Sequence, residues 1–342
     1  MKTIELDGSY GEGGGQILRT ALSLSCVTGH ALKLFNIRGG RKKPGLMPQH
    51  ITCVNAASEI TGAKIKGAEA GSTELIFVPG KTMPGNYIFD IKTAGSCTLV
   101  FQTLLPPLMF GEGSSIITIR GGTHVHLSPT YHYLSEVLLT MLRNVGVHVD
   151  STIYKYGFYP KGGGEVNFTV HPVSQVKGLD LSERGELIAL HGYSAVSRLP
   201  VQIARRQKNA MEQKVKSFPA DIQIMNVVSP GEGTFTFLAA QYENTFAGFS
   251  SIGKRGKPAE KVGAETASAF LDFNCKSTVF DPHLADQIVL YLSLSREDSS
   301  FTTSCITEHL LTNLWVIKKF IDIHYQVEGQ LNSEGRIKIL HL

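Results

Sequence analysis

The spacing of hydrophobic residues along the chain predicts short strands that alternate with amphipathic helices. After a first strand, apolar residues recur at helical intervals from Ile17 to Leu24, and strand-like alternation then returns. The first unit is predicted to contain, in order, elements at Thr3–Asp7, Ile17–Leu24, Leu32–Ile37, Gln49–Thr61, Ala63–Lys66 and Glu74–Val78. This order of strand, helix, strand, helix, strand and strand can bury its helices on one face of a sheet.

The same order of elements is predicted twice more. The second unit is expected at Tyr87–Ile91, Thr98–Phe110, Ser115–Ile119, Tyr131–Val145 and two strands on either side of Gly157–Gly164. The third unit is interrupted, with a first strand at Glu186–His191 and the remaining elements at His283–Leu294, Glu308–Ile321, His324–Glu328 and Arg336–Leu340. Three copies of one layout indicate a tandem repeat.

A segment from about Gly192 to Lys276 has a pattern of its own. It is predicted to contain a polar helix, two strands and a further helix, at Ala204–Lys216, Asp221–Val228, Thr234–Tyr242 and Pro258–Leu271. The predicted fold class is therefore α+β, with three tandem βαβαββ-type repeats and an inserted smaller α/β domain. The repeats are expected to form the main domain at residues 1–185 and 277–342, and the insert residues 186–276.

Composition and charge narrow the class of protein. Of the 342 residues, 42% are hydrophobic and 18% are charged, which excludes a disordered chain or a coiled coil. The net charge of +4 allows a local basic groove but not a polybasic coat. No apolar run reaches the roughly 18 residues that span a bilayer, and no signal peptide follows Met1. The five cysteines form no CxxC pair, so we expect a cytoplasmic protein without membrane contact.

Several short strings fail as motifs. Gly80-Lys81-Thr82 lacks the first glycine of a P-loop, because position 75 is Leu75, and the string Gly11-Glu12-Gly13 is followed by Gln16 where a dinucleotide fingerprint needs glycine. No Gly-x-Ser-x-Gly elbow occurs. His124 and His126 would share one face of a strand, but a metal site there needs further ligands.

The segment Asp7–Arg19 carries the first candidate chemistry. Its glycines leave backbone N–H groups unshielded just before a helix, which favours binding of an anion such as phosphate. Glu12 is the only acid among these glycines, and beside phosphates its natural role is to hold a bridging Mg²⁺. Arg19 lies one turn into the helix and could reach the same anion. The alternative is a flexible loop with a solvated glutamate.

Two further segments combine glycine with cations. Arg38–His50 contains four cations before a helix that starts near Gln49, which suits an RNA or nucleotide phosphate, although a solvated charged face is the alternative. Tyr156–Gly164 places aromatic residues and one lysine beside three glycines, a combination that suits base stacking and phosphate contact. A tight hairpin turn explains its glycines equally well.

Two helix starts near the C-terminus complete the candidates. Asp281 and Pro282 are expected to begin a helix whose first turn presents Asp286 and Gln287, either to a ligand or only to solvent. A second helix is expected to be capped by Thr307, with Leu310, Leu314, Ile317 and Ile321 as its buried stripe. In its first turn the helix dipole would keep His309 neutral and nucleophilic, and Asn313 is expected beside it to fix the tautomer of the ring.

Together these segments resemble the RNA 3′-terminal phosphate cyclase family nearly end to end. The resemblance lies in DGSYGEGGGQILRTALSLS, the segment from Lys43 to His50, AGSCTLVFQT, GFYPKGGG, HLADQ and HLLTN. It implies an ATP-dependent ligase in RNA processing, with the repeat domain as the catalytic one. A histidine would attack the α-phosphorus of ATP and become adenylylated. AMP would pass to an RNA 3′-phosphate, giving RNA(3′)pp(5′)A, and the neighbouring 2′-OH would close a 2′,3′-cyclic phosphate.

The resemblance also implies site residues, motif by motif. His309 is the catalytic nucleophile, Glu12 holds Mg²⁺ or Mn²⁺, and the RNA phosphate contacts Arg38, Arg41 and His50. ATP would be bound by Gly13, Gly14, Arg19, Gln102, His283, Leu284, Ala285, Asp286 and Gln287. His283 stands where the family can have a tyrosine that stacks on adenine, which leaves weaker or imidazole-based stacking open. Pro48 stands where a basic residue can make an RNA contact.

Two other classes of protein remain as alternatives. A noncatalytic relative of the cyclases, acting as a binding module in ribosome assembly, would share the fold but lack the nucleophilic histidine, and His309 is present. An enolpyruvyl transferase of similar repeat design gives no reason for the HLADQ and HLLTN pair. The sequence leaves the physiological RNA and the oligomeric state open.

Overall fold

The computed structural model describes residues 2–341, which form four sheets of four strands each. In the first sheet the strand order is β1-β2-β4-β3, with β1 parallel to β2 and the remaining pairs antiparallel. Its elements are β1 (Thr3–Asp7), α1 (Gly15–Thr28), β2 (Ala31–Phe35), α2 (Pro48–Thr61), β3 (Lys64–Lys66) and β4 (Leu75–Val78). The hydrophobic pattern predicted all six elements.

The second sheet has the order β5-β6-β8-β7 and the same sequence of parallel and antiparallel pairs. Its elements are β5 (Asn86–Asp90), α3 (Cys97–Met109), β6 (Ser115–Gly121), α4 (Tyr131–Tyr133), η1 (Leu134–Leu138), α5 (Leu139–Asn144), β7 (Val149–Lys155) and β8 (Gly164–Val170). The single helix predicted over Tyr131–Val145 is wrong in detail, because the turn η1 is a π-helix that interrupts it. The extra residue in that turn shifts the side chains that follow it.

The third sheet has the order β15-β16-β14-β9, again with one parallel pair and two antiparallel pairs. Its elements are β9 (Asp180–Leu181), α8 (Pro282–Leu292), β14 (Ser299–Thr303), α9 (Glu308–Phe320), β15 (Ile323–Gly329) and β16 (Gly335–His341). Strands β9 and β14 were not predicted from the sequence. Glu186–His191 does not start this sheet as predicted, because these residues belong to a strand of the fourth sheet.

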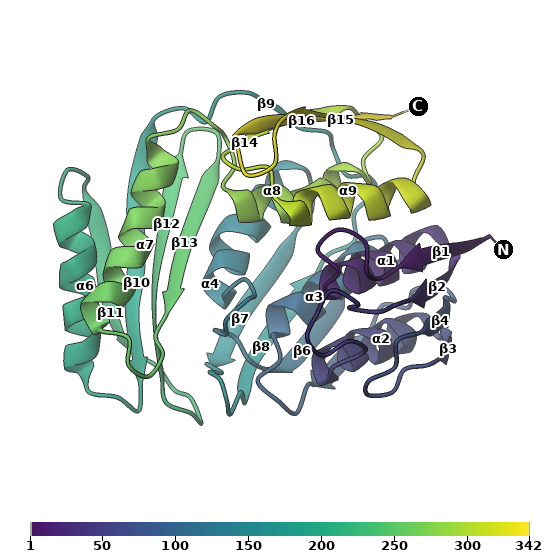
Figure 1. Cartoon of the computed structure of the whole chain (residues 1–342), viewed down its shortest axis with the longest axis horizontal. Helices are drawn as coiled ribbons and strands as arrows, with labels where there is room; N and C mark the ends of the chain where they lie inside the picture. Colours follow the sequence, from purple (N-terminus) through teal and green to yellow (C-terminus); the bar gives the residue numbers. More distant parts are fainter. Residues whose placement is uncertain (1, 342) are drawn as a thin grey trace.

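The fourth sheet has a different order, β11-β10-β12-β13, and two helices of its own. Its elements are β10 (Leu187–Ser197), α6 (Val201–Lys214), β11 (Ala220–Asn226), β12 (Gly233–Tyr242), β13 (Phe246–Ile252) and α7 (Ala259–Asn274). The strand β13 was not predicted. In Figure 1 this sheet, with α6 and α7, lies at one end of the molecule beside α4 and β7.

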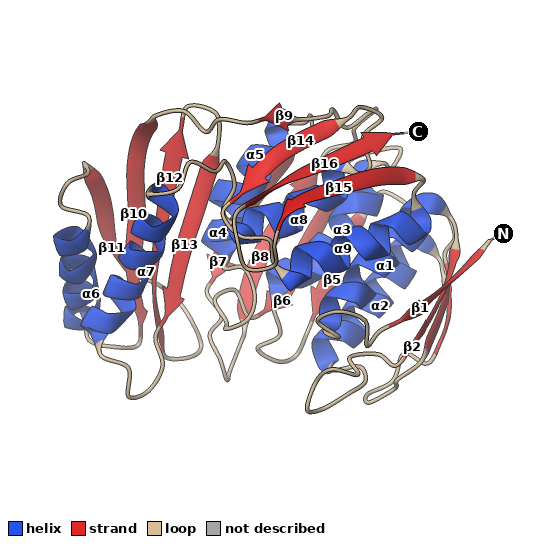
Figure 2. Cartoon of the chain, turned by 45° about the horizontal axis from the view of Figure 1, so that its top comes forward, coloured by secondary structure: helices blue, strands red, loops and turns tan. Residues whose placement is uncertain are grey.

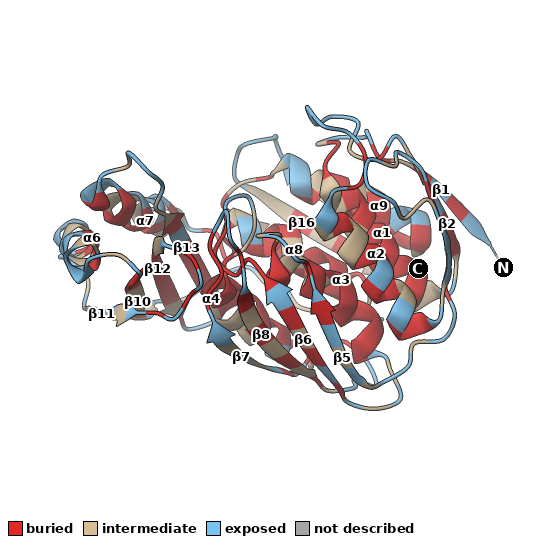
Figure 3. Ribbon diagram, turned by 90° about the horizontal axis from the view of Figure 1, so that it is seen from below, coloured by how far each residue is buried: buried red, intermediate tan, exposed pale blue. Residues whose placement is uncertain are grey.

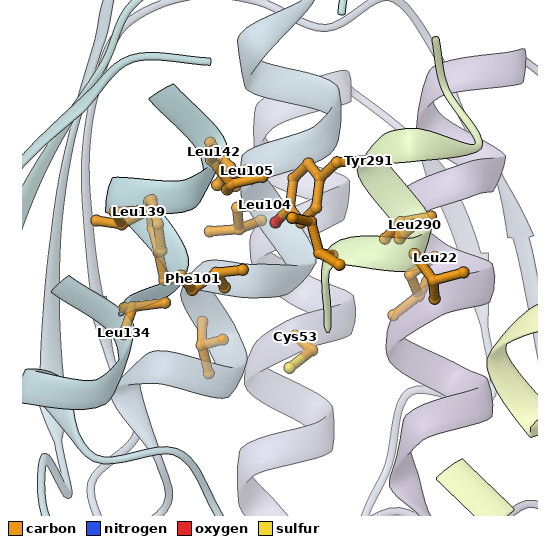
Figure 4. Packing of buried hydrophobic residues seen from close by; sticks show 14 of the residues in the cluster. Leu22, Cys53, Phe101, Leu104, Leu105, Leu134, Leu139, Leu142, Leu290 and Tyr291 are labelled. Carbon is orange, nitrogen blue, oxygen red and sulfur yellow. The ribbon is translucent and has the colours of Figure 1, made fainter. Parts of the chain in front are cut away.

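The core lies where the helices of the other three sheets meet. Figure 2 shows α1, α2, α3, α8 and α9 gathered between these sheets, and Figure 3 shows that the helices are mostly buried while strand residues alternate. In the close view of Figure 4, Tyr291 packs against Leu104 and Leu105, and Leu22 faces Leu290. A second hydrophobic cluster, around Met211 and Phe270 among others, belongs to the fourth sheet and its helices.

The packing of α1 and α9 places their N-termini side by side. The apolar residues of α1 from Ile17 to Leu24 are fully buried, and the helix ends at Gly29, whose φ of 70° gives the left-handed end that glycine favours. Leu310, Leu314 and Ile317 of the predicted stripe of α9 are buried, whereas Ile321 lies beyond the helix end. No helix within residues 2–341 is long and apolar enough to cross a membrane.

Candidate active site

The glycine-rich loop before α1 is packed against its neighbours. Gly13 has a φ of 58°, and a Cβ there would lie 2.9 Å from the backbone nitrogen of Gly40. A side chain at Gly14 would collide with the carboxylate of Glu12, whose side chain is only 15% exposed. In the structure the carboxylate of Glu12 is therefore packed within the loop and is not fully solvated.

The same loop rests on helix α9. The ring of Tyr10 stacks on Trp315 with centroids 4.0 Å apart and an angle of 11° between the planes. Gly11, at a φ of 54°, touches the hydroxyl of Thr312, which leaves no room for a Cβ. These contacts bring Glu12 to the first turns of α9, where its backbone N–H faces the hydroxyl of Thr312, 300 residues away in sequence.

His309 lies in the first turn of α9, as predicted. Thr307 caps the helix by accepting a hydrogen bond of 3.0 Å from the backbone N–H of Leu310. The Nδ1 atom of His309 contacts Oε1 of Gln16 and lies 3.2 Å from Oε2 of Glu12. Both contacting atoms are acceptors, so the neutral ring carries its proton on Nδ1 and leaves a lone pair on Nε2. The side chain is 47% exposed and accessible to a ligand.

The surroundings of His309 favour its neutral form. Burial lowers its pKa to about 4, and the nearby cations Arg19 and Arg41 and the imidazole of His283 act in the same direction. The surroundings thus favour the neutral imidazole that was expected, although partial burial and nearby cations contribute to this besides the helix terminus.

The group that orients His309 differs from the one expected. Asn313 is buried, accepts a hydrogen bond of 2.7 Å from the hydroxyl of Thr20 and donates one of 2.7 Å to the backbone oxygen of Asp286. It joins three helices and does not contact the imidazole, so its predicted role is wrong. Gln16 takes that role, and its Nε2 also donates to the backbone oxygen of His309 at 3.2 Å.

The basic segment brings two cations and a histidine to the same place. Arg41 forms an ion pair with Glu12. His50 accepts a hydrogen bond of 3.2 Å from the backbone N–H of Met47 at Nδ1, so its neutral ring carries the proton on Nε2. This Nε2 lies against Gly15, because a Cβ added at Gly15 would clash with it. The N–H group of the His50 ring is therefore at the start of α1. Burial, together with Arg19 and Arg38, lowers the pKa of His50 to about 3.

Arg38 and Arg19, the other two arginines predicted to bind phosphate, also interact with the protein itself. Nη1 of Arg38 donates to the backbone oxygens of Lys43 and Gly45, both at 2.8 Å, and so holds the basic loop in shape. Arg19 lies near both imidazoles, and its charge lowers the pKa of both His50 and His309. Burial lowers the pKa of its own guanidinium, which makes an anionic partner favourable there.

The HLADQ segment begins α8, next to the start of α9. Asp281 caps the helix, as predicted, by accepting from the backbone N–H groups of His283 and Leu284. Its neighbour His283 is exposed, whereas the side chains of Leu284 and Ala285 are completely buried. Any contact of the last two with a nucleotide would have to use their backbone.

Two contacts tie α8 to its neighbours. The hydroxyl of Thr307 bonds to the carboxyl of Asp286, which joins the HLADQ segment to the cap of α9. Burial raises the pKa of Asp286 to about 8. Gln287 contacts the side chain of Gln102 on α3 and donates to the backbone oxygen of His283 at 2.6 Å. Through these contacts Asp286 connects the start of α8 to the start of α9, and Gln102 connects the start of α8 to α3.

Two metal sites were considered from the sequence, one at Glu12 and one at His124 and His126. Neither has a complete set of protein ligands in the part of the chain that the structure describes. Within residues 2–341 no group of three or more His, Cys, Asp or Glu side chains could hold a metal ion. His124 is fully buried and stacks on Phe235, while His126 is exposed, so the two do not form a metal pair. A divalent ion at Glu12 would depend on phosphate oxygens for its remaining ligands.

The sequence also matches a known protein family. The family model described as RNA 3′-terminal phosphate cyclase matches residues 10–327, a range that includes Glu12, His50, Asp286 and His309. The chain belongs to this family.

Relatives named RNA 3′-terminal phosphate cyclase match nearly the whole chain. The protein of Methylococcus capsulatus is 42% identical over 94% of this chain and 91% of its own, and that of Ralstonia nicotianae is 43% identical over 96% and 95%. The protein of the archaeon Thermococcus kodakarensis is 40% identical over 99% of both chains. Among solved structures, the enolpyruvyl transferase NikO from Streptomyces tendae aligns at 9% identity with a TM-score of 0.37, over 98% of this chain and 48% of its own.

For this member of the RNA 3′-terminal phosphate cyclase family, we expect adenylylation to persist at low pH. A depressed pKa keeps His309 neutral until the pH falls to about 4, whereas an ordinary imidazole would be protonated below about 6.5. The single-turnover rate should stay level from pH 8 to pH 5 and fall only below that, measured with labelled ATP on protein whose circular dichroism stays native. A midpoint near 6.5 would contradict the assignment.

We also expect Glu12→Ala to slow adenylylation by about 10²-fold while changing the melting temperature little. The carboxylate lies beside both His309 and Arg41, where it can act on the reacting groups. Loss of its ion pair costs little stability because the side chain of Arg41 is 43% exposed and can be solvated. Calorimetry and single-turnover labelling separate the two effects. A large drop in melting temperature with normal labelling would make Glu12 a structural residue.

Proposed function

We propose that this chain is an ATP-dependent enzyme that converts an RNA 3′-terminal phosphate into a 2′,3′-cyclic phosphate through a His309–AMP intermediate. The observation that carries the proposal is the surroundings of His309. Its Nδ1 is held by Gln16 beside Glu12, and its Nε2 is left with a lone pair in a cluster of phosphate-binding groups. Family membership supports the same activity.

The first step uses Nε2 of His309 as the nucleophile. It attacks the α-phosphorus of ATP, the bond to the β-phosphate oxygen breaks, and pyrophosphate leaves. The imidazolium that forms keeps its proton on Nδ1, where Gln16 and Glu12 stabilise the developing positive charge. ATP would lie along the starts of α1 and α8, where Gly13, Gly14, Gln102 and the segment from His283 to Gln287 are within reach.

Glu12 would hold a divalent ion, which would supply neutralisation of negative charge on the phosphates. The remaining charge falls to the cations of the protein. Arg19 and Arg41 lie beside His309, and Nε2 of His50 donates at the start of α1. These groups suit an RNA 3′-phosphate that accepts AMP from His309.

Ring closure follows from activation of the RNA end. The terminal phosphate oxygen attacks the phosphorus of His309–AMP and gives RNA(3′)pp(5′)A, with His309 regenerated. The neighbouring 2′-OH then attacks the 3′-phosphorus, loses its proton and expels AMP. The hydroxyl is already held next to the phosphorus by the ribose, so correct placement supplies most of the acceleration.

Incubation with ATP labelled at the α-phosphate tests the proposal. We expect a protein–AMP bond that is labile in acid and stable in alkali, and transfer of the label to an RNA that ends in a 3′-phosphate. The same RNA should become resistant to phosphatase as the cyclic phosphate forms. A binding module in ribosome assembly would carry no label, and that result would reject the cyclase activity.

We also infer that the fold is three copies of one unit with an insertion. Three sheets share the strand order and the sequence of parallel and antiparallel pairs, whereas the β10–β13 sheet differs and has a hydrophobic cluster of its own. The insert would then occupy residues 186–276, between β9 and α8 of the third unit. Limited proteolysis should release a fragment with these boundaries if the insert folds by itself.

A further inference from the structure

A continuous line of contacts leads away from the active site across the second sheet. Gln49, next to His50 in the first turn of α2, accepts a hydrogen bond of 2.7 Å from the backbone N–H of Ser96. Gly95 packs on Gln49, since a Cβ there would lie 3.0 Å from the Cβ of Gln49. On the next loop, a Cβ on Gly162 would lie 2.9 Å from the Cα of Ala94. The predicted phosphate site thus adjoins the 157–164 hairpin.

The same hairpin is fitted against the β10–β13 sheet. The ring of Phe158 covers Gly233 at the start of β12, where a Cβ would overlap the ring. A Cβ on Gly163 would lie 2.8 Å from Cγ of Pro230, and one on Gly231 would lie 3.3 Å from the Cβ of Lys161. Gly163 of the hairpin, together with Gly231 and Gly233 of the facing segment, thus allows close packing between segments that are about 70 residues apart. The hairpin therefore connects the surface of the second sheet to that of the fourth sheet.

A basic cavity lies further along this surface. It has a volume of about 500 Å³ and is lined by His126, Lys254, Arg255, Gly256, Lys257, Pro258, Lys261 and Glu265. The loop that carries most of these residues begins at Gly253, whose N–H donates to the backbone oxygen of Thr234 on β12 at 2.8 Å. Glu265 is already paired with Lys257. No ion pair within residues 2–341 involves Lys254 or Arg255, and both are exposed.

Exposed aromatic and apolar side chains lie on the segments that adjoin this cavity. Tyr159, at the tip of the hairpin, is 74% exposed, and Lys161 beside it is also exposed. Leu127, next to His126, is 98% exposed. An exposed tyrosine on a surface that also carries cations suits single-stranded nucleic acid, whose bases stack on rings and whose phosphates contact cations.

We propose that this surface, the outer groove (Tyr159, Lys161, His126, Lys254, Arg255 and Lys261), binds the nucleotides of single-stranded RNA upstream of the reacting end. The proposal rests on the proposed function, which puts the 3′-phosphate at Arg41 and His50. A longer RNA leaving that point meets the hairpin next, and the insert after it. Tyr159 stacks on a base, while Lys254 and Arg255 contact backbone phosphates. The insert thereby favours long RNA ends over short ones.

The test compares two double variants on two substrates. Lys254→Ala/Arg255→Ala removes two charges from the outer groove, and Lys64→Ala/Lys66→Ala removes two exposed charges from β3 as a matched control. For a 3′-phosphorylated RNA of about a dozen nucleotides, we expect the groove variant to raise KM about tenfold and the control to leave it unchanged. The wild type and both variants should cyclise a 3′-phosphorylated dinucleotide at the same rate. They should also react with labelled ATP at the same rate of adenylylation.

Two further measurements sharpen the comparison. Removing two phosphate contacts should lower the slope of log affinity against log salt by about 1.4, at about 0.7 for each contact with single-stranded RNA. Tyr159→Phe should keep the affinity for long RNA, whereas Tyr159→Ala should lose about tenfold, because stacking needs the ring and not the hydroxyl.

RNA binding by the outer groove can be tested independently of the proposed cyclase activity. Binding of a fluorescent RNA without a 3′-phosphate reports on the outer groove even if the chain cyclises no RNA. Equal affinity of the wild type and the Lys254→Ala/Arg255→Ala variant for this RNA would overturn the proposal. So would an acidic peptide that displaces the RNA only from the wild type and binds more tightly, since the groove would then be a protein-binding surface.

Discussion

Replacing His309 by asparagine is expected to abolish formation of the protein–AMP bond, with a loss of at least about 10⁴-fold in the rate. The reason is that asparagine has no nitrogen with a nucleophilic lone pair at this position, whereas its amide preserves polarity in the first turn of α9. The fold should persist, because the side chain of His309 is 47% exposed and its loss opens no cavity. Single-turnover labelling with ATP measures the effect, and circular dichroism checks the fold.

Gln16→Ala is the matched control for the geometry of His309. It keeps the nucleophile but removes the group that contacts Nδ1 and the backbone of His309. We expect a slower reaction by about 10²-fold with the same final amount of label, since Gln16 positions the ring and does not react. Labelling of His309→Asn at the wild-type level would show that another residue accepts AMP.

Asp281→Ala is expected to cause the largest loss of stability, about 4 kcal/mol. The carboxylate is buried and accepts from four donors, which are the hydroxyl of Tyr133 at 2.8 Å and the backbone N–H groups of His283, Leu284 and Gly248. Loss of a helix cap costs about 1 kcal/mol, and each buried donor left without a partner adds about 1–3 kcal/mol. Chemical denaturation of the variant and the wild type measures the difference.

Ser96→Ala provides the comparison for Asp281→Ala. Ser96 caps α3 through a bond of 3.3 Å from the backbone N–H of Leu99 and is also buried, but its hydroxyl serves fewer donors. We expect a loss of about 1 kcal/mol there. Asp281→Asn should fall between the two, because its amide oxygen can still accept. Equal losses for Asp281→Ala and Ser96→Ala would mean that only the helix cap matters at Asp281.

The hydrophobic pattern predicted most of the helices, because these depend on local spacing. The apolar residues of α1 and α9 recur at helical intervals, and Asp281 and Thr307 cap their helices as expected. Strands β9, β13 and β14 were missed. Such segments become strands only when a neighbour supplies hydrogen bonds, as β16 does for β14, and no local pattern reports that neighbour.

Within the candidate site, the sequence identified the residue types but not every contact. Asn313 follows His309 at i+4, and helical spacing alone made it the expected partner, yet it joins Thr20 and the backbone of Asp286. Gln16 was overlooked because it lies 293 residues away along the chain. It stands inside the glycine-rich segment, so its place beside Glu12 was a signal that could have directed attention to it.

The sequence by itself determined the family, the helix starts and the chemistry that each segment can supply, because capping, spacing and glycine content act over a few neighbouring residues. Only the tertiary structure decided which segments meet. The starts of α1, α2, α8 and α9 come together because their apolar faces share one core, and burial there with nearby cations depresses the pKa of His309. Such proximity depends on long-range packing, which short-range patterns do not encode.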